Sequence, residues 1–420
     1  MNHFKNIQVF EKFLNSLDRF RMKLDLGRTC KGLEALGIRP DDIPAVQIVG
    51  TNGKGSTACF LESLARSHGL KTGLYTSPHL ISVRERIRIN NSSPPHDLWL
   101  DAANEVLGRC RGLGPTYFEM LTLMAVLIFK QEKVDLAVME AGLGGRYDAT
   151  SALTPVVNVF TPVGLDHTLI LGNTKEKIAM DKSMAMKKGS VVIAGQEEAV
   201  MDVFMTRAHN IGAKVYQLQD LFCFDNGQLK FALMPEMVLK ASDIGLKGFF
   251  QLGNAATALL AWKIFAEKKG FVSDQNLCVL ALKEAFWPGR VHFVQKDPMV
   301  ILDGAHNPQG MEALKTALKE MGVQPKTIVF SCLRDKNVQQ LIDMVRDFCP
   351  EKVFVPDISE NPRAMPRQEL AALFGKPALP VDDTAKYLRL LKQEEAPVLV
   401  CGSLYLLGEI YAAFPVWMER

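Results

Sequence analysis

A glycine-rich segment with one lysine is the part of this sequence best suited to binding phosphate. It reads GTNGKGST over residues 50–57, directly after the apolar run 45–49 and before an amphipathic run that starts at Ala58. Glycines let backbone N–H groups turn toward an anion, a helix start adds partial positive charge, and Lys54 supplies a full charge. The segment departs from the usual phosphate loop because Gly55, not a hydroxyl residue, follows the lysine. The strand before it and the helix after it still favour a phosphate loop over a simple turn with a solvated lysine.

A carboxylate is expected close to this loop. Glu140 ends the apolar run 136–139 and is followed by the glycine-rich stretch 142–145. Ligands of open α/β sheets bind at the carboxyl ends of the strands. Alone, Glu140 would be interpreted as a charged cap on a strand. Beside a phosphate loop it predicts a ligand for Mg²⁺, which prefers oxygen.

An acidic residue and a histidine follow the next apolar run. Asp166 and His167 come shortly after residues 156–160. A single histidine more often packs in a core or lies on the surface than binds a metal. The sheet edge that it would share with Glu140 favours a metal-binding role for His167.

The same combination recurs far along the chain. Asp303 and His306 follow the apolar run 299–302, so both are expected at a strand end that faces a nucleotide. Asn307 and Pro308 are typical of a helix N-cap and first turn. The two interpretations are compatible.

Alternating strands and helices must position these groups. The first series of expected strands covers residues 45–50, 72–76, 135–140, 155–160 and 190–194. The expected helices cover residues 56–68, 97–110, 117–131, 174–187 and 253–268. This pattern predicts a mostly parallel sheet with helices on both faces. Residues 5–37 also have helical periodicity, and residues 222–224 and 229–231 are candidates for short antiparallel strands.

A second alternating series follows the turn WPGR at residues 287–290. Its strands are expected at 299–302, 327–330, 352–355 and 398–400, and its helices at 308–321, 337–348, 366–374 and 403–413. We therefore predict two domains, residues 1–288 with the phosphate loop and a smaller α/β domain over residues 289–420. Arg290 on the stiff turn between them could reach a γ-phosphate.

Composition narrows the class of protein. The chain has 420 residues, of which 48% are hydrophobic and 23% charged, as in globular proteins with more than one domain. A net charge of +3 does not favour nucleic acid or a membrane surface as a partner. The eight cysteines form no Cys-x-x-Cys pair, which indicates reduced thiols in a cytoplasmic protein. The N-terminal residues mix charges with apolar residues, unlike a signal peptide, and no apolar stretch is long enough for a membrane span.

Taken together, these segments resemble the folylpolyglutamate synthase/dihydrofolate synthase family, within the wider Mur-ligase-like ATP-dependent amide ligases. The resemblance spans residues 45 to 310 in family order and rests on these segments: GTNGKGS (50–56), YTSPHL (75–80), ERIRIN (85–90), YFEMLT (117–122), EAGLGGRYDAT (140–150), GLDHT (164–168), Gln251 with NAATAL (254–259), WPGR (287–290) and LDGAHNPQG (302–310). The family has a large phosphate-loop domain and a Rossmann-like C-terminal α/β domain. Residues 310–420 fit only through their alternating pattern.

The resemblance also implies roles for individual residues. ATP would be bound by the loop and by four residues elsewhere, a set made of Thr51, Asn52, Gly53, Lys54, Gly55, Ser56, Thr57, Asn254, Arg290, Asp303 and His306. One magnesium ion would be held by Ser77, Glu140 and His167, and a second by a carbamate on Lys182. Around Lys182 the chain departs from the family pattern, with Asp181 in place of glutamate and Ser183 in place of alanine.

The implied activity joins L-glutamate to folate or dihydropteroate at the expense of ATP, with Lys54, His167, Lys182 and Arg290 as catalytic residues. An acyl phosphate would be the intermediate, and the enzyme is expected to be a cytoplasmic monomer. Two alternatives remain at this point. A ligase of cell-wall precursors would usually have threonine after the loop lysine, where this chain has Gly55. A nucleotide-binding regulator without catalysis would not need the glutamate, histidine and lysine together.

Overall fold

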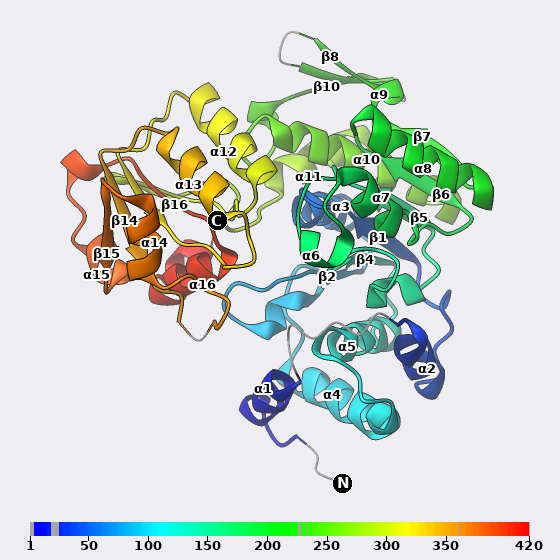
Figure 1. Cartoon of the computed structure of the whole chain (residues 1–420). Coiled ribbons are helices and arrows are strands. Elements are labelled where there is room, and N and C mark those ends of the chain that lie inside the picture. The colour runs from blue at the N-terminus through cyan, green and yellow to red at the C-terminus, as the bar shows by residue number, and fades with distance from the viewer. Residues whose placement is uncertain (1–3, 18–24, 226–227, 233, 360, 420) are drawn as a thin grey trace.

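The computed structural model describes residues 4–17, 25–225, 228–232, 234–359 and 361–419. They form a large N-terminal α/β domain and a smaller C-terminal α/β domain beside it (Figure 1). The expected fold class is confirmed. The boundary that we predict between residues 288 and 289 falls between a helix ending at Glu284 and a strand beginning at His292, and stays a prediction.

A seven-stranded sheet forms the centre of the N-terminal domain. Its strands are β1 (Ala45–Val49), β2 (Thr72–Tyr75), β3 (Ile87–Ile89), β4 (Leu136–Glu140), β5 (Val157–Phe160), β6 (Ser190–Ile193) and β7 (Lys214–Gln217). They lie in the order β3-β2-β4-β1-β5-β6-β7, and all neighbours are parallel except β2 and β3. Parallel strands covered on both faces favour continuous apolar runs, and β1 is buried along its whole length.

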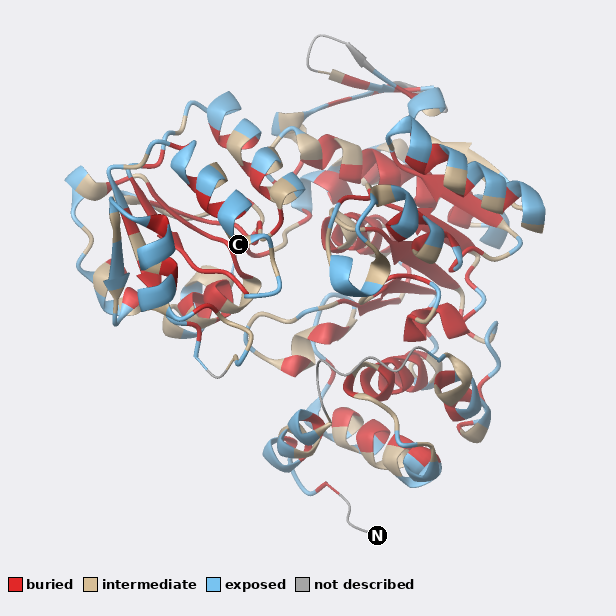
Figure 2. Cartoon of the chain, in the orientation of Figure 1, coloured by how far each residue is buried: buried red, intermediate tan, exposed pale blue. Residues whose placement is uncertain are grey.

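Helices cover both faces of this sheet, as the sequence pattern predicts. Val46 and Ile48 of β1 point to the face that carries α3 (Lys54–Ser67), α10 (Phe250–Lys269) and α11 (Gln275–Glu284). The opposite face carries α1 (Ile7–Ser16), α2 (Gly27–Ala35), α4 (His96–Cys110), α5 (Tyr117–Gln131), α7 (Lys175–Ser183) and α8 (Glu198–Ile211). Figure 2 shows the strands buried between these layers, while the outer sides of the helices are exposed.

Some elements differ from the sequence-based expectation. The helical segment expected over residues 5–37 consists of α1 and α2, and residues 18–24 between them lie outside the described residues. The expected antiparallel strands are confirmed and belong to a three-stranded sheet of β8 (Phe222–Asp225), β9 (Gln228–Phe231) and β10 (Met234–Lys240). The remaining short elements are α6 (Thr168–Leu171), α9 (Leu218–Leu221), η1 (Val83–Arg86), η2 (Arg111–Leu113), η3 (Ala149–Ala152) and η4 (Ala241–Asp243).

The C-terminal domain contains a six-stranded sheet. Its strands are β11 (His292–Lys296), β12 (Met299–Leu302), β13 (Thr327–Phe330), β14 (Lys352–Pro356), β15 (Ala378–Val381) and β16 (Val398–Cys401). They lie in the order β11-β12-β16-β13-β14-β15, and β11 is the antiparallel member. The helices are α12 (Pro308–Glu320), α13 (Val338–Arg346), α14 (Arg367–Phe374), α15 (Thr384–Arg389) and α16 (Leu404–Ala413), with η5 (Gln393–Glu395) and η6 (Pro415–Met418).

The two sheets direct their ligand-binding edges toward one another. The loops after β1, β4 and β5 and the loops after β12, β13 and β16 line a common cavity. Within the described ranges, no helix has both the length and the apolar character needed to cross a membrane.

Candidate functional site

A cleft of about 680 Å³ lies between the two domains. The sequence-predicted site residues that line it are Thr51, Asn52, Gly53, Lys54, Gly55, Ser56, Ser77, Glu140, His167, Lys182, Asn254, Arg290, Asp303 and His306. Thr57 is fully buried within α3 and does not line the cleft. Residues more than 200 positions apart in the chain therefore meet at one cavity, as the strand-end rule predicts.

The glycine-rich loop has the backbone geometry of an anion-binding site. Gly53 has φ of +84°, a left-handed conformation that glycine adopts without a steric cost, and α3 begins at the next residue. A Cβ atom on Gly53 would lie 2.4 Å from Oδ1 of Asn254, so this position also needs glycine for the close approach of α10. The free N–H groups of the first turn of α3 thus start at the cleft, where they favour negative charge.

Two lysines converge on the carbonyl of Gly50 at the base of this loop. Lys54 Nζ donates to Gly50 O at 3.2 Å and to Thr51 O at 3.0 Å, and Lys182 Nζ donates to Gly50 O at 2.8 Å. Burial, together with the positive charge of Lys54, lowers the pKa of Lys182 to about 7. At neutral pH a large fraction of Lys182 therefore carries a neutral, nucleophilic amine.

Glu140 and His167, which the sequence predicts as metal ligands, both line the cleft. Glu140 is 4% exposed, and its Oε2 accepts the backbone N–H of Ser77 at 3.0 Å. Burial raises the pKa of Glu140, although the charges of Lys54 and Arg290 oppose that change. Burial lowers the pKa of His167 to about 4, so its imidazole is neutral and able to bind a cation.

The side chains of Glu140, His167 and Ser77 suit magnesium, which also binds water and substrate phosphates, better than a metal whose ligands all come from the protein. Within the part of the chain that the structure describes, no three histidine, cysteine or acidic side chains are grouped around a point where a metal could bind. Magnesium usually takes one or two carboxylates and completes its shell with water and substrate phosphates. Glu140, His167 and the hydroxyl of Ser77 line the cavity next to the loop and suit that mode of binding.

The turn that joins the domains is fixed by Asp303 from β12. Asp303 accepts the N–H of Val291 and the N–H of Ala305, both at 2.8 Å, and burial raises its pKa. The adjacent guanidinium of Arg290 opposes this rise. Asp303 thereby holds the backbone directly after Arg290 and directly before His306, and the side chains of both residues line the cleft.

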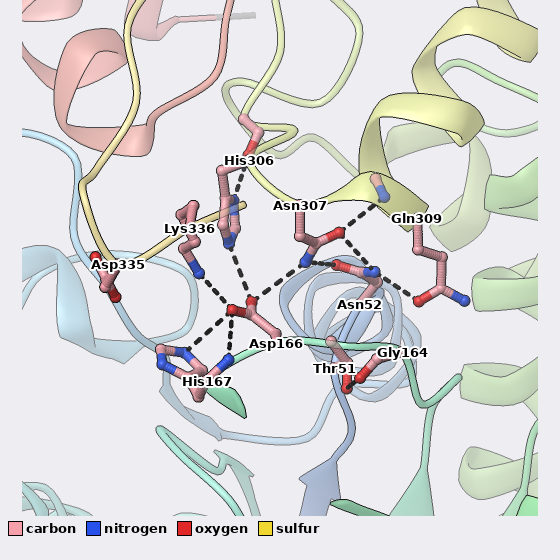
Figure 3. A network of polar contacts seen from close by, with 12 residues as sticks. Thr51, Asn52, Gly164, Asp166, His167, His306, Asn307, Gln309, Asp335 and Lys336 are labelled. Atoms are coloured by element: carbon pink, nitrogen blue, oxygen red, sulfur yellow. Dashed lines mark hydrogen bonds and ion pairs between the residues drawn. The ribbon is translucent and has the colours of Figure 1, made fainter. Parts of the chain in front are cut away.

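A polar network at the centre of the cleft joins the domains directly (Figure 3). Asp166 accepts hydrogen bonds from Lys336 Nζ and, at 3.2 Å, from Asn307 Nδ2. Burial alone would raise the pKa of Asp166, but the contact with His306 and the charges of His167 and Lys336 hold it well below its usual range. Lys336 is not among the site residues predicted from the sequence. Its only signal is an Asp-Lys pair that follows β13 at the same sheet edge.

One end of the cleft is aromatic and was also not assigned from the sequence. Tyr117, Phe118 and Tyr147 line it, and the guanidinium of Arg86 lies 5.3 Å from the ring centre of Tyr117. Nearby, the buried carboxylate of Asp148 accepts the N–H groups of Gly142 and Leu143 at 2.8 and 3.0 Å and so holds the glycine-rich loop after β4. This end offers flat apolar walls next to polar groups.

Comparison with known families matches both domains. Residues 48–262 match the model of the Mur ligase middle domain, and residues 289–404 match that of the Mur ligase glutamate ligase domain. Among curated proteins, the Bacillus subtilis dihydrofolate synthase/folylpolyglutamate synthase is 33% identical over 413 residues, which are 93% of this chain and 95% of the relative.

Solved structures with the same fold carry ligands. E. coli FolC in complex with DHPP and ADP has a TM-score of 0.88 and 26% identity, and the match covers 100% of both chains. A bifunctional folylpolyglutamate synthase/dihydrofolate synthase with Mn, AMPPNP and L-glutamate bound has a TM-score of 0.84 and 27% identity, over 98% of both chains.

Proposed function

The chain belongs to the Mur ligase family, in its branch of folylpolyglutamate and dihydrofolate synthases, and we propose that it joins L-glutamate to a folate-type carboxylate with ATP as the energy source. The products are an amide, ADP and phosphate. The observation that carries this proposal is the single cleft lined both by the phosphate loop of one domain and by Arg290, Asp303 and His306 of the other. The names of the relatives favour this function over ligation of a cell-wall precursor or a purely regulatory role.

ATP would lie with its phosphates on the loop. The left-handed Gly53 and the start of α3 favour the phosphates, and Lys54 adds positive charge. Asn254, Asp303 and His306 contact other parts of the nucleotide. Glu140, His167 and Ser77 would hold magnesium, which neutralises phosphate charge when bound.

The reaction needs activation because a carboxylate is a poor acyl donor. A substrate carboxylate oxygen bonds to the γ-phosphorus of ATP while the bond to the β-γ bridging oxygen breaks, which gives an acyl phosphate and ADP. The neutral amine of L-glutamate then bonds to the acyl carbon, phosphate leaves, and the amine proton goes to solvent or a nearby base. Lys54 and Arg290 stabilise charge on the transferred group. The enclosed cleft limits hydrolysis of the acyl phosphate.

We further propose that Lys182 is carbamylated and holds a second magnesium ion. The neutral Nζ forms a bond to the carbon of CO₂, and one amine proton leaves to solvent. A pKa of about 7 and full burial favour this step, because a lysine with an ordinary pKa is almost entirely protonated at neutral pH. Asp181, the residue that departs from the family pattern, accepts the N–H of Gly145 at 2.8 Å, so it supports the glycine-rich loop after β4. A ¹³C-carbamate resonance in ¹³C-bicarbonate that is absent in Lys182→Met would support the modification, and its absence from the unsubstituted protein would exclude it.

The aromatic end of the cleft suits a pterin ring, since Tyr117, Phe118 and Tyr147 can stack on a flat heterocycle. A phosphate-release assay with dihydropteroate, dihydrofolate or tetrahydrofolate, each with ATP and L-glutamate, tests the function. We expect phosphate release that requires both the pterin substrate and glutamate, and a product heavier by one glutamyl residue. ATP binding without turnover in every mixture would refute the proposal.

A further inference from the structure

The network in Figure 3 contains a cross-domain contact that the proposed chemistry does not use. Asp166 lies in the loop after β5 of the N-terminal domain, and Lys336 lies 170 positions later, between β13 and α13 of the C-terminal domain. Their side chains are each 9% exposed and bonded to one another. A carboxylate and an ammonium that are withdrawn from water in this way depend on each other, because separating them would leave two buried, unpaired charges.

A second pair of contacts ties the same interface to the phosphate loop. The amide groups of Asn52 and Asn307 face one another, with Nδ2–Oδ1 distances of 3.0 and 3.2 Å, and Asn52 Nδ2 also donates to Gln309 Oε1 at 2.8 Å. Asn307 simultaneously caps α12 by accepting the N–H of Gly310 at 2.8 Å. The start of α12 is therefore attached to the loop that would bind ATP.

The side chain of Gln309 lies close to the loop after β5. A Cβ atom on Gly164 would lie 2.3 Å from Oε1 of Gln309, so a larger residue at position 164 would displace the end of that side chain. The carboxylate of Asp166 also accepts the backbone N–H of the next residue, His167, at 2.8 Å, and this bond fixes the carboxylate between the domains. The contact between the domains is thus built from polar side chains of both.

We propose that Asp166, Lys336 and Asn307 are positioning residues that dock the C-terminal domain on the phosphate loop and thereby align the incoming amino acid with the acyl phosphate. This inference rests on the proposed function for its kinetic consequence but not for its structural one. The docked state brings Arg290 and His306 into the cleft of the N-terminal domain. Loss of docking should therefore weaken the use of L-glutamate more than the binding of nucleotide, because the loop of the N-terminal domain would still hold the phosphates without the contacts of Asp303 and His306.

Substitution of Lys336 tests the proposal, with Lys352→Met as the matched control. Lys352 pairs with Glu395 within the C-terminal domain and has no partner across the interface among the contacts of the described residues. In Lys336→Met we expect kcat/KM for L-glutamate to fall at least about tenfold, with ATP affinity changed by less than about threefold. Lys336→Arg should retain most of the activity, and Lys352→Met all of it.

A structural readout separates this proposal from the proposed function. Small-angle scattering of the full chain with magnesium and the non-hydrolysable analogue AMPPNP should give a larger radius of gyration for Lys336→Met than for the unsubstituted chain and for Lys352→Met. Asp166→Asn should resemble Lys336→Met, and the double variant should be no worse than either single variant, because both remove one contact. Unchanged scattering and an effect on L-glutamate below twofold would overturn the docking role. If the unsubstituted chain has no ligase activity, the scattering comparison still decides the docking role.

Discussion

The buried Lys182 should make the protein less stable than it would be with an apolar side chain of similar length. Lys182 is 4% exposed, and its ammonium shares Gly50 O with a second lysine, Lys54. We therefore predict that Lys182→Met stabilises the fold at neutral pH while it abolishes ligation. A functional group kept at a cost in stability is a common feature of active sites.

The magnitude follows from the difference between the pKa of Lys182 in the unfolded and the folded chain, 10.5 and about 7. Between pH 7 and pH 10.5 the unfolded chain binds more protons at this site than the folded chain. The loss of folding free energy caused by Lys182 is therefore nearly complete at pH 7 and below, and it disappears as the pH rises through 10.5. Linkage gives a cost of about 4 kcal/mol at pH 7 and about 1 kcal/mol at pH 9.5. The lost hydrogen bond to Gly50 offsets about 1 kcal/mol. The net gain for Lys182→Met is then about 3 kcal/mol at pH 7 and close to zero at pH 9.5.

Thermal unfolding in CO₂-depleted buffer at the two pH values measures this effect. We expect Tm of Lys182→Met to exceed that of the unsubstituted protein by about 5 °C at pH 7, with little difference at pH 9.5. Lys188→Met is the matched control. Lys188 lies six residues after Lys182 and is exposed, so the change in Tm on its substitution should not depend on pH. A variant that is less stable at pH 7, or a gap that is equal at both pH values, would show that Lys182 is not a buried, destabilised ammonium.

Four further substitutions test the site. Lys54→Ala and His167→Ala should each abolish folate-dependent phosphate release while circular dichroism and Tm remain close to those of the unsubstituted protein; substantial turnover in either would contradict its role. Gly53→Ala should weaken ATP binding at least about tenfold by calorimetry, because the position has φ of +84° and the new Cβ would meet Asn254 at 2.4 Å. Asp148→Ala should lower stability by about 3 kcal/mol in denaturant unfolding, since it removes the acceptor of several buried N–H groups; a loss below 1 kcal/mol would count against that.

The strands that carry the site could be predicted because they lie in the interior of parallel sheets. β1, β4 and β5 are mostly apolar and buried along their whole length, and they lead directly to Gly50, to Glu140 and to the loop that contains Asp166. Strands at the edges could not be predicted in the same way. β15 is only partly buried and contains Pro380, and β11 is half-buried throughout. Their apolar pattern is weak because they have a neighbour on one side only.

The individual site residues could be predicted where a strand end or a loop motif identifies them, but the contact between the domains could not. Asp166 and Lys336 come together only because two separately folded sheets present their carboxyl edges to one another. Neither residue has a local pattern that indicates its partner. The same holds for Asn307, which the sequence identifies as a helix cap and which the structure also shows bonded to Asn52.

The charge distribution of the cleft favours an anion at the phosphate loop. Lys54 and Arg290 place positive charge around the phosphate loop, and Glu140 is a carboxylate next to it. The carboxylate of Asp166 does not balance that charge, because it is already paired with Lys336 and hydrogen-bonded to Asn307 of the other domain. The positive charge at the loop is therefore free to attract an anion, such as the phosphate groups of a nucleotide. A nucleotide bound there would meet a loop whose Asn52 is already bonded to Asn307 at the start of α12.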